Sequence, residues 1–302
     1  MRRKIFITTA INQDVHDAFL KKNAEEAVRA YEAGSAIVYV YTGNLQAEEA
    51  EETEKKMESM KRTLEFIRSR CDAICCITTE VNHLSSLEKQ IAPVAAFKPE
   101  LATLDVGLMN FGLSEISKIS WDESGWEKPS FLSTREAGFA KRFNQLEKYI
   151  RMMNENGTRP EFVVYDVATI SNIAYLAKEG IIKTPVYMQF VLGIVGGIPA
   201  NVNNLTFLYD TACRLLGKNN FYWSVGGAGK TQMRMAGAGL ALGGNVRVVL
   251  ESSDTRAHDL GQLGGEQVAS VRDIAMSMGY EVATSADVRK MMSLKGADKV
   301  VL

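Results

Sequence analysis

Eight apolar segments rich in β-branched residues recur along the chain of 302 residues, and each is followed by a stretch with helical spacing. The segments are continuous apolar runs, which is typical of strands covered on both faces. Eight strand–helix units in about 300 residues predict an α/β fold, a (β/α)8 TIM barrel. No linker or change of composition divides the sequence, so we expect a single domain over residues 1–302. The expected strands are residues 4–11, 35–41, 71–79, 100–107, 161–168, 184–193, 221–226 and 245–252.

The longest irregular segment comes between the fourth and fifth predicted strands. It spans residues 109–133, includes Trp121 and Trp126, and precedes a predicted helix over about residues 134–155. Long loops in barrels often cover the active site or mediate contacts between subunits.

Composition excludes several classes of function. The chain has 35 basic and 36 acidic residues, whereas a nucleic-acid-binding protein would show a basic excess. No apolar run approaches the roughly 20 residues that span a bilayer, so we expect no membrane partner. The first residues lack the apolar core of a signal peptide, which predicts a cytoplasmic protein. The four cysteines, at positions 71, 75, 76 and 213, follow no zinc-binding spacing and are expected to be buried, reduced thiols.

The sequence SVGGAGKT at residues 224–231 differs at one position from a nucleotide-binding P-loop, which has Gly where Ser224 stands. A nucleoside triphosphatase is therefore one alternative, although the motif follows the seventh strand rather than an early one. In (β/α)8 enzymes, phosphate groups often bind after strands seven and eight. We therefore predict a phosphate-binding loop at Gly227, Gly229, Lys230 and Thr231. A tight turn before a closely packed helix would explain the same glycines.

Five segments together resemble the β-keto acid cleavage enzymes, which include 3-keto-5-aminohexanoate cleavage enzyme. The segments keep the family's order and spacing over nearly the whole chain. The resemblance implies a (β/α)8 barrel that binds zinc and cleaves a β-keto acid with acetyl-CoA, giving acetoacetate and a new CoA thioester. It also implies a homo-oligomer, and a glycine-rich loop within reach of the CoA phosphates. The segments are AEEAVRAYEAGSAIV, PELATLDVGLMNFG, YLAKEGIIKTPVYMQFVLGIVGGIPA, GAGKTQMRMAGAGLALGGNVRVVLE and EVATSADVRKMM.

The zinc-binding positions of the family are altered in this sequence. The family has a His-x-His pair at the end of the second strand, where this chain has Tyr39 and Tyr41. The third family ligand corresponds to Glu251. Catalytic zinc sites usually take three ligands from the protein, and neutral tyrosine is a poor ligand because its pKa is near 10. We therefore expect zinc to be absent or relocated.

The base positions are altered as well. The family's Arg is retained as Arg247, but the Asp that acts with it in deprotonating the substrate is replaced by Ser252. A family Glu in the fifth strand corresponds to Val163. A relocated metal site would have to use Glu251 and the histidines, which follow the first, third and eighth strands; as loop residues, these histidines are otherwise expected to be solvated. The histidines are His16, His83 and His258.

The candidate catalytic residues are Arg247, Glu251, Tyr39 and Tyr41. Arg247 either binds a substrate carboxylate in a bidentate manner or forms a structural pair with Glu251. The two tyrosines either fill the space left by zinc, with hydroxyls bonded to Glu251 or water, or donate a hydrogen bond to a substrate oxygen.

The candidate substrate-binding residues follow the first and third strands. Asn12 follows the first strand, and Thr78, Thr79 and Glu80 follow the third. Glu80 would disfavour a β-keto carboxylate because it adds negative charge.

Two hypotheses remain from these residues. In the first, the protein is an acyl-exchanging lyase or transferase that uses an altered β-keto acid and acetyl-CoA. In the second, it binds a small carboxylate or a CoA ester without this catalysis.

Overall fold

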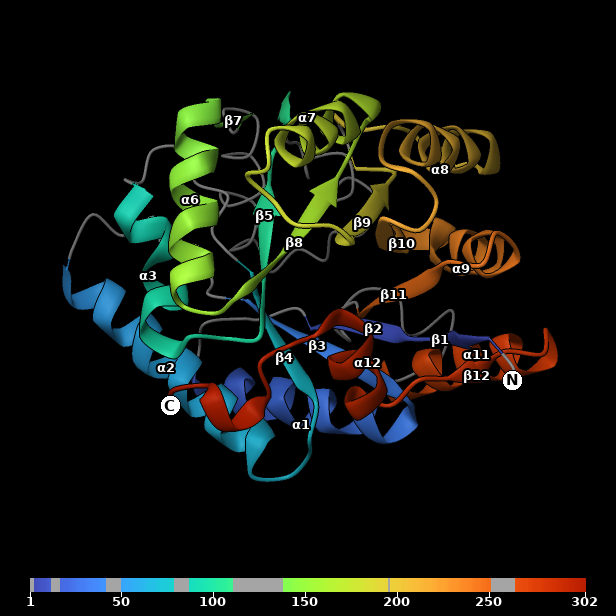
Figure 1. Cartoon of the computed structure of the whole chain (residues 1–302). Coiled ribbons are helices and arrows are strands. Elements are labelled where there is room, and N and C mark those ends of the chain that lie inside the picture. Colours follow the sequence, from blue (N-terminus) through green and yellow to red (C-terminus); the bar gives the residue numbers. More distant parts are fainter. Residues whose placement is uncertain are drawn as a thin grey trace, which may run out of the picture.

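The computed structural model describes residues 3–11, 17–41, 50–78, 87–110, 138–194, 196–250 and 264–302. Eight parallel strands follow one another around a closed barrel, and the last strand pairs with the first (Figure 1). The predicted (β/α)8 barrel is therefore confirmed. In barrel order the strands are β2 (Ile7–Ile11), β3 (Ser35–Tyr41), β4 (Ile74–Thr78), β5 (Leu101–Asp105), β8 (Arg159–Val164), β9 (Val186–Leu192), β10 (Phe221–Gly227) and β11 (Asn245–Leu250).

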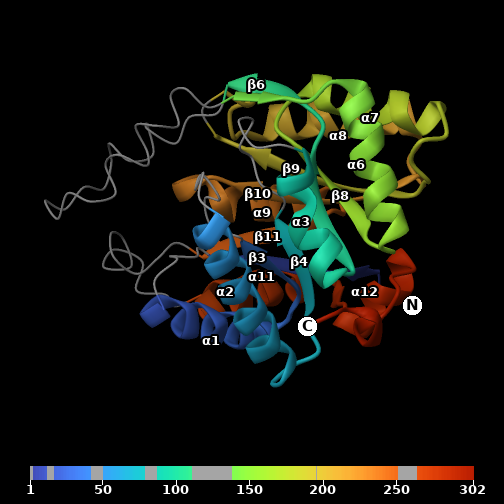
Figure 2. The same cartoon turned by 90° about the vertical axis from the view of Figure 1, so that its left-hand side faces the viewer.

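Helices surround the barrel and bury one face each against it (Figure 2). The spacing of apolar residues explains their orientation: α6 (Phe143–Glu155) buries Leu146, Tyr149, Ile150 and Met153, which recur at helical intervals. None of the helices in the described ranges is long and apolar enough to cross a membrane. The other surrounding helices are α1 (Asp17–Ala33), α2 (Ala50–Arg68), α3 (Leu87–Phe97), α7 (Val167–Lys178), α8 (Val202–Leu216), α9 (Gln232–Ala241) and α11 (Gly264–Ser277).

The amino-terminal end of the barrel is closed by α12 (Ser285–Met292). Val288 and Met292 of this helix belong to the apolar cluster inside the barrel, together with Phe6, Ile37 and Leu101. The chain before α12 forms β12 (Glu281–Val282), which pairs in parallel with β1 (Lys4–Ile5). The predicted strand over residues 4–11 is therefore divided, and only β2 joins the barrel.

A two-stranded antiparallel sheet follows β5. It is formed by β6 (Leu108–Asn110) and β7 (Gly138–Ala140). The prediction of a helix from about residue 134 is wrong here, because residues 138–140 pair with β6 and α6 begins only at Phe143.

Candidate functional site

Four polar side chains form a hydrogen-bonded chain through the barrel interior, which we call the polar chain: Arg247, Gln189, Tyr39 and Glu161. An Nη of Arg247 donates to Oε1 of Gln189. The amide nitrogen of Gln189 donates to the hydroxyl of Tyr39 at 2.7 Å, and this hydroxyl donates to Oε1 of Glu161 at 2.5 Å. Gln189 and Glu161 are fully buried and Tyr39 is almost so. The polar chain therefore links Arg247 of β11 to the buried carboxylate of Glu161 in β8.

Three further side chains complete this buried layer. Cys76 of β4 approaches Oε2 of Glu161 at 3.6 Å. Tyr187 and Ser224 share a hydrogen bond of 3.0 Å, and Gln189 approaches the same Ser224 oxygen at 3.4 Å. Because these residues come from different strands, the layer holds the side chain of Gln189 in one orientation.

Burial sets the charge states in the polar chain. It raises the pKa of Glu161 to about 7, although hydrogen bonding by Tyr39, the charge of Arg247 and the thiol of Cys76 all lower it. Burial, and then the charge of Glu161, raise the pKa of Tyr39 well above its ordinary value. The phenol of Tyr39 is therefore neutral near pH 7.

A neutral phenol with both hydrogen bonds committed does not suit a zinc ligand. The guanidinium carbon of Arg247 also lies 4.5 Å from the centre of the Tyr39 ring, which places a cation there. Tyr41 is two residues further along β3 and is half-buried. Tyr39 thus does not fit zinc, and the correspondence of Tyr39 and Tyr41 to the family's histidines stays a prediction.

The other predicted metal ligands cannot be placed, because Glu251, His16, His83 and His258 lie outside the described residues. Within the ranges that the structure does describe, no group of three or more His, Cys, Asp or Glu side chains could hold a metal ion.

Asp105 and Lys141 lie near the polar chain at the carboxyl end of the barrel. Asp105 is 5% exposed, and its Oδ1 has no hydrogen-bond partner among the described residues. Burial raises the pKa of Asp105, while the charges of Lys141 and Arg247 oppose the rise. Burial also lowers the pKa of Lys141, and Asp105 opposes that change. This end of the barrel therefore combines two cations with one buried acid.

Arg247 keeps hydrogen-bonding capacity for a ligand. Its Nε is buried and has no partner in the described part of the chain. Gly226 of β10 lies beside this side chain, since a Cβ there would be in ordinary van der Waals contact, 3.4 Å from Cβ and Cδ of Arg247. The expected pairing of Arg247 with Glu251 cannot be assessed, since Glu251 is not described.

The glycine-rich segment does not form a P-loop. Strand β10 continues to Gly227, so Ser224 is a buried strand residue rather than the start of a phosphate-binding loop. A Cβ on Gly227 would lie 2.9 Å from Cγ of Met235, and Gly229 has a φ of 53°. The hydroxyl of Thr231 donates to the carbonyl of Ala228 at 2.7 Å. A tight turn against α9 therefore explains the two glycines and Thr231.

Lys230 is the exposed residue of this turn and lies two positions before the first residue of α9. Its predicted contact with a phosphate group stays a prediction. Of the predicted substrate-binding residues, Thr78 is half-buried at the end of β4 and its hydroxyl donates to the carbonyl of Val40 at 3.3 Å. Thr79, Glu80 and Asn12 lie outside the described residues.

Sequence reasoning missed Glu161, Gln189 and Asp105. Val163, matched to the family's Glu, is buried on the same face of β8 as Glu161, two residues away. A charged residue on the inward face of an apolar run was the available signal for Glu161. Asp105 ends β5, and the carboxyl ends of barrel strands are where catalytic residues gather.

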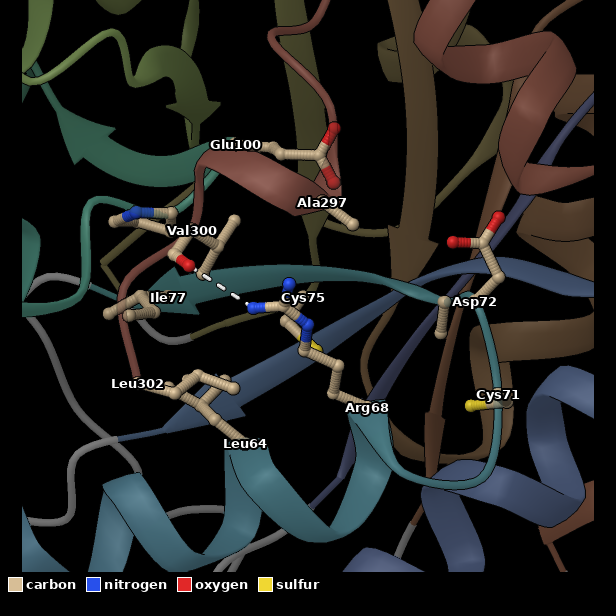
Figure 3. A pocket seen from close by; sticks show the side chains of 12 residues that line it. Leu64, Arg68, Cys71, Asp72, Cys75, Ile77, Glu100, Ala297, Val300 and Leu302 are labelled. Carbon is tan, nitrogen blue, oxygen red and sulfur yellow. Dashed lines mark hydrogen bonds between the residues drawn. The ribbon is translucent and has the colours of Figure 1, made fainter.

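A small cavity of roughly 40 Å³ lies near the amino-terminal ends of β4 and β5 (Figure 3). Arg68 crosses it and donates to the carbonyl of Val300 at 3.1 Å, which ties α2 to the C-terminal segment. Burial raises the pKa of the Cys75 thiol in its wall to about 12. This end of a barrel serves stability rather than catalysis, and the cavity has room for little more than ordered water.

Known proteins resemble the chain over nearly its full length. A sequence profile described as beta-keto acid cleavage enzyme matches residues 18–294. The 3,5-dioxohexanoate:acetyl-CoA acetone transferase of Paraburkholderia graminis is 30% identical over 98% of this chain and 97% of its own. The 3-keto-5-aminohexanoate cleavage enzyme of Acetoanaerobium sticklandii is 30% identical over 96% of this chain and 98% of its own.

A solved structure supports the fold. ObcA bound to oxaloacetate superposes with a TM-score of 0.62 at 18% identity, covering 91% of this chain and 66% of the ObcA chain. The chain thus spans about two thirds of the ObcA chain, and a likeness at this identity shows the barrel alone. With the profile match and the two relatives, the sequence places the chain in the β-keto acid cleavage enzyme family.

Proposed function

We propose that this protein exchanges acyl groups between a β-keto acid and acetyl-CoA, giving acetoacetate and a new CoA thioester. Family membership supports the type of reaction, and one relative is named for transfer to acetyl-CoA from 3,5-dioxohexanoate. The substrate's carboxylate carbon and C2 leave with the acetyl group as acetoacetate, while the rest of its acyl chain passes to the CoA sulfur.

The observation that carries the proposal is the placement of Arg247. Its guanidinium is held by Gln189 and by the face of the Tyr39 ring, and its buried Nε has no partner among the described residues. A planar guanidinium offers paired donors that match the two oxygens of a carboxylate. A buried donor without a partner is unfavourable, so a ligand oxygen there would satisfy it. We assign Arg247 to the β-keto carboxylate.

We further infer that the reaction does not depend on zinc held at Tyr39 and Tyr41. The phenol of Tyr39 is neutral and fully hydrogen-bonded, and Arg247 already supplies positive charge beside its ring. The charge that develops on the keto oxygen would then be stabilised by Arg247 and by other donors at the barrel mouth.

The expectation of a cytoplasmic homo-oligomer with a single domain remains a prediction. Exposed apolar side chains on α8, at Val202, Phe207 and Leu215, are compatible with contact between copies of the chain.

The test begins with untagged protein, purified without chelator and measured for metal content. It is then incubated with acetyl-CoA and a panel of β-keto acids, including 3-keto-5-aminohexanoate and 3,5-dioxohexanoate. Mass spectrometry follows acetoacetate and the new thioester. We expect turnover of at least one acid without stoichiometric zinc, and Arg247→Ala should lower kcat/KM by about 100-fold or more. The matched control Arg70→Ala changes an exposed arginine after α2 and should leave the rate unchanged.

Two results would contradict the proposal. Tight binding of a β-keto acid without any turnover would favour the binding-protein hypothesis. Stoichiometric zinc whose removal abolishes activity would contradict the expected turnover without zinc.

A further inference from the structure

The side chain of Asp105 is directed into the barrel. In β5 the residues Ala102 and Leu104 belong to the core between barrel and helices, whereas Leu101 belongs to the apolar cluster inside the barrel. Successive strand residues alternate between faces, so Asp105 shares the inward face of Leu101. It is the last residue of the strand and therefore stands at the catalytic end.

The backbone beside Asp105 is fixed by α7. The amide of Asn172 donates to the carbonyl of Val106 at 2.6 Å. Gly107 lies against Thr169, whose Oγ1 would be 2.7 Å from an added Cβ. Asp105 is thus held on a rigid element. A catalytic group needs such support, because it must be positioned accurately against a substrate atom.

The carboxylate of Asp105 is buried, and one of its oxygens has no hydrogen-bond partner among the described residues. It is 5% exposed, and Oδ1 has no partner among the described residues, although a buried unpaired acceptor is costly. The positive charges of Lys141 and Arg247 lower the pKa of Asp105. The charge of Asp105 in turn raises the pKa of Tyr165. A buried carboxylate oxygen that has no partner in the described part of the chain can accept a contact from a ligand at the mouth of the barrel.

The strand register places Asp105 close to the guanidinium of Arg247. Strand β8 lies between β5 and β9 (Figure 1). Asp105 pairs with Val163, and Val163 pairs with Gln189, whose side chain accepts the hydrogen bond from Arg247. Two strand spacings separate the backbones of Asp105 and Gln189 by about 10 Å, and inward side chains converge. A base about 3 Å from C2 of a β-keto acid would stand roughly 6–7 Å from the guanidinium carbon that binds the adjacent carboxylate. The backbone separation, shortened by the inward side chains, is therefore of the size that such a substrate requires.

We propose that Asp105 is the general base that removes a proton from C2 of the β-keto acid whose carboxylate Arg247 binds. The inference rests on the proposed function. Oδ1 takes the proton, and the C–H electron pair forms an enolate with charge on the keto oxygen. C2 attacks the acetyl carbonyl of acetyl-CoA and the thiolate leaves. The thiolate then attacks the original keto carbon, the C2–C3 bond breaks, and the C2 carbanion recovers the proton from Asp105.

Charge and burial suit Asp105 to this role. Burial raises its pKa and so makes it a stronger base than an exposed aspartate, while Lys141 and Arg247 favour its ionised form. The family's Asp after strand eight is Ser252 in this sequence. Asp105 would thus supply from β5 the carboxylate missing from that position.

The test separates deprotonation from the rest of the reaction. Acetoacetate is the probe, and exchange of its C2 protons for deuterium is followed by NMR in D₂O without acetyl-CoA. We expect the wild-type protein to accelerate exchange above the solution rate. Asp105→Asn should lower that acceleration by about 100-fold or more while acetoacetate affinity, measured by calorimetry, stays within about twofold. Asp105→Glu, which keeps a carboxylate in a shifted position, should give an intermediate rate.

Asp72→Asn is the matched control, because this aspartate is exposed and lies before β4 at the opposite end of the barrel. It should exchange at the wild-type rate. The role of Asp105 would be overturned if folded Asp105→Asn protein exchanged the C2 protons at the wild-type rate. It would also be overturned if the wild-type protein bound acetoacetate but did not accelerate the exchange. Failure of the wild type to bind acetoacetate, or binding that Arg247→Ala leaves unchanged, would instead overturn the proposed function.

Discussion

Tyr39 connects the polar side chains in the centre of the barrel. Its hydroxyl donates to Glu161 and accepts from Gln189, and its ring faces Arg247. Glu161 and Gln189 are themselves buried and polar, so removing the hydroxyl would leave each of them with one hydrogen bond fewer. Tyr39 therefore also helps to orient Arg247, both through Gln189 and through the face of its own ring.

Tyr39→Phe should destabilise the protein measurably. The variant keeps the ring but leaves the carboxylate of Glu161 and the amide of Gln189 each without one partner in a buried site. We expect a loss of about 2–3 kcal/mol in the free energy of unfolding at pH 7, measured by urea denaturation. In the control Tyr175→Phe, the residue is 44% exposed and the loss should be within about 0.5 kcal/mol. Equal losses in the free energy of unfolding for both variants would show that the buried hydroxyl of Tyr39 stabilises the protein no more than an exposed one.

Single residues were predictable only where the resemblance supplied their position. The resemblance predicts that Tyr39 faces the barrel interior, and the structure places it there, while the site roles of Tyr39 and Arg247 stay predictions. The sequence does not indicate Glu161 and Gln189, because their partner Tyr39 lies 122 and 150 positions away in the chain. A hydrogen bond across a barrel leaves no periodic trace in the sequence, whereas burial of a whole strand does.

At the scale of elements, the glycine-rich turn between β10 and α9 shows how packing can imitate a binding motif. Gly239 of α9 lies so close to β10 that an added Cβ would be 2.3 Å from Cγ1 of Val225. With Gly227 and the left-handed Gly229, it allows the helix to pack closely against the strand. Only Lys230 in this turn has a side chain that packing does not explain.

Lys230→Ala should weaken the binding of CoA. The ammonium group is exposed beside the start of α9, where it can pair with a phosphate near the positive end of the helix. We expect a rise in Kd of about two- to fivefold at low salt, measured by calorimetry with free CoA. The matched control is Lys218→Ala, in the exposed turn that precedes β10. An unchanged Kd for Lys230→Ala would leave the turn with a structural role only.

Strand positions followed from the sequence because each strand is buried on both faces and reads as an apolar run. The elements that escaped prediction depend on distant pairing. Strand β1 separates from β2 because it pairs with β12, near the other end of the chain. Strand β7 exists because β6 is placed beside it, so a segment expected to be helical is extended.

Over the whole molecule, the barrel interior is arranged in layers along its axis. Apolar side chains and α12 close the amino-terminal end, the polar chain lies in the middle, and Asp105 and Lys141 stand at the carboxyl end. The buried carboxylate of Glu161 therefore lies between an apolar plug and the mouth. Its ionisation is tied to folding, because water reaches it only when the barrel opens.

The stability of the whole protein should therefore depend on pH through Glu161. Its pKa is about 7 in the folded protein against an ordinary value of 4.5, so the folded state retains a proton that the unfolded chain has released. Below about pH 4.5 both states are protonated and Glu161 contributes no pH dependence. Between these two values the free energy of unfolding should fall as pH rises, by roughly 3 kcal/mol at most, and above about pH 7 this contribution should be constant.

Glu161→Gln isolates this contribution, because the amide keeps an acceptor for Tyr39 and cannot ionise. Urea denaturation at a series of pH values from 5 to 8 should show the wild type losing stability relative to the variant, with the difference levelling off above about pH 7. Asp105 also has a raised pKa, but it is present in both proteins and cancels in the difference. Parallel curves for the two proteins would mean that Glu161 is already ionised at pH 5, and that Arg247 and Tyr39 outweigh its burial.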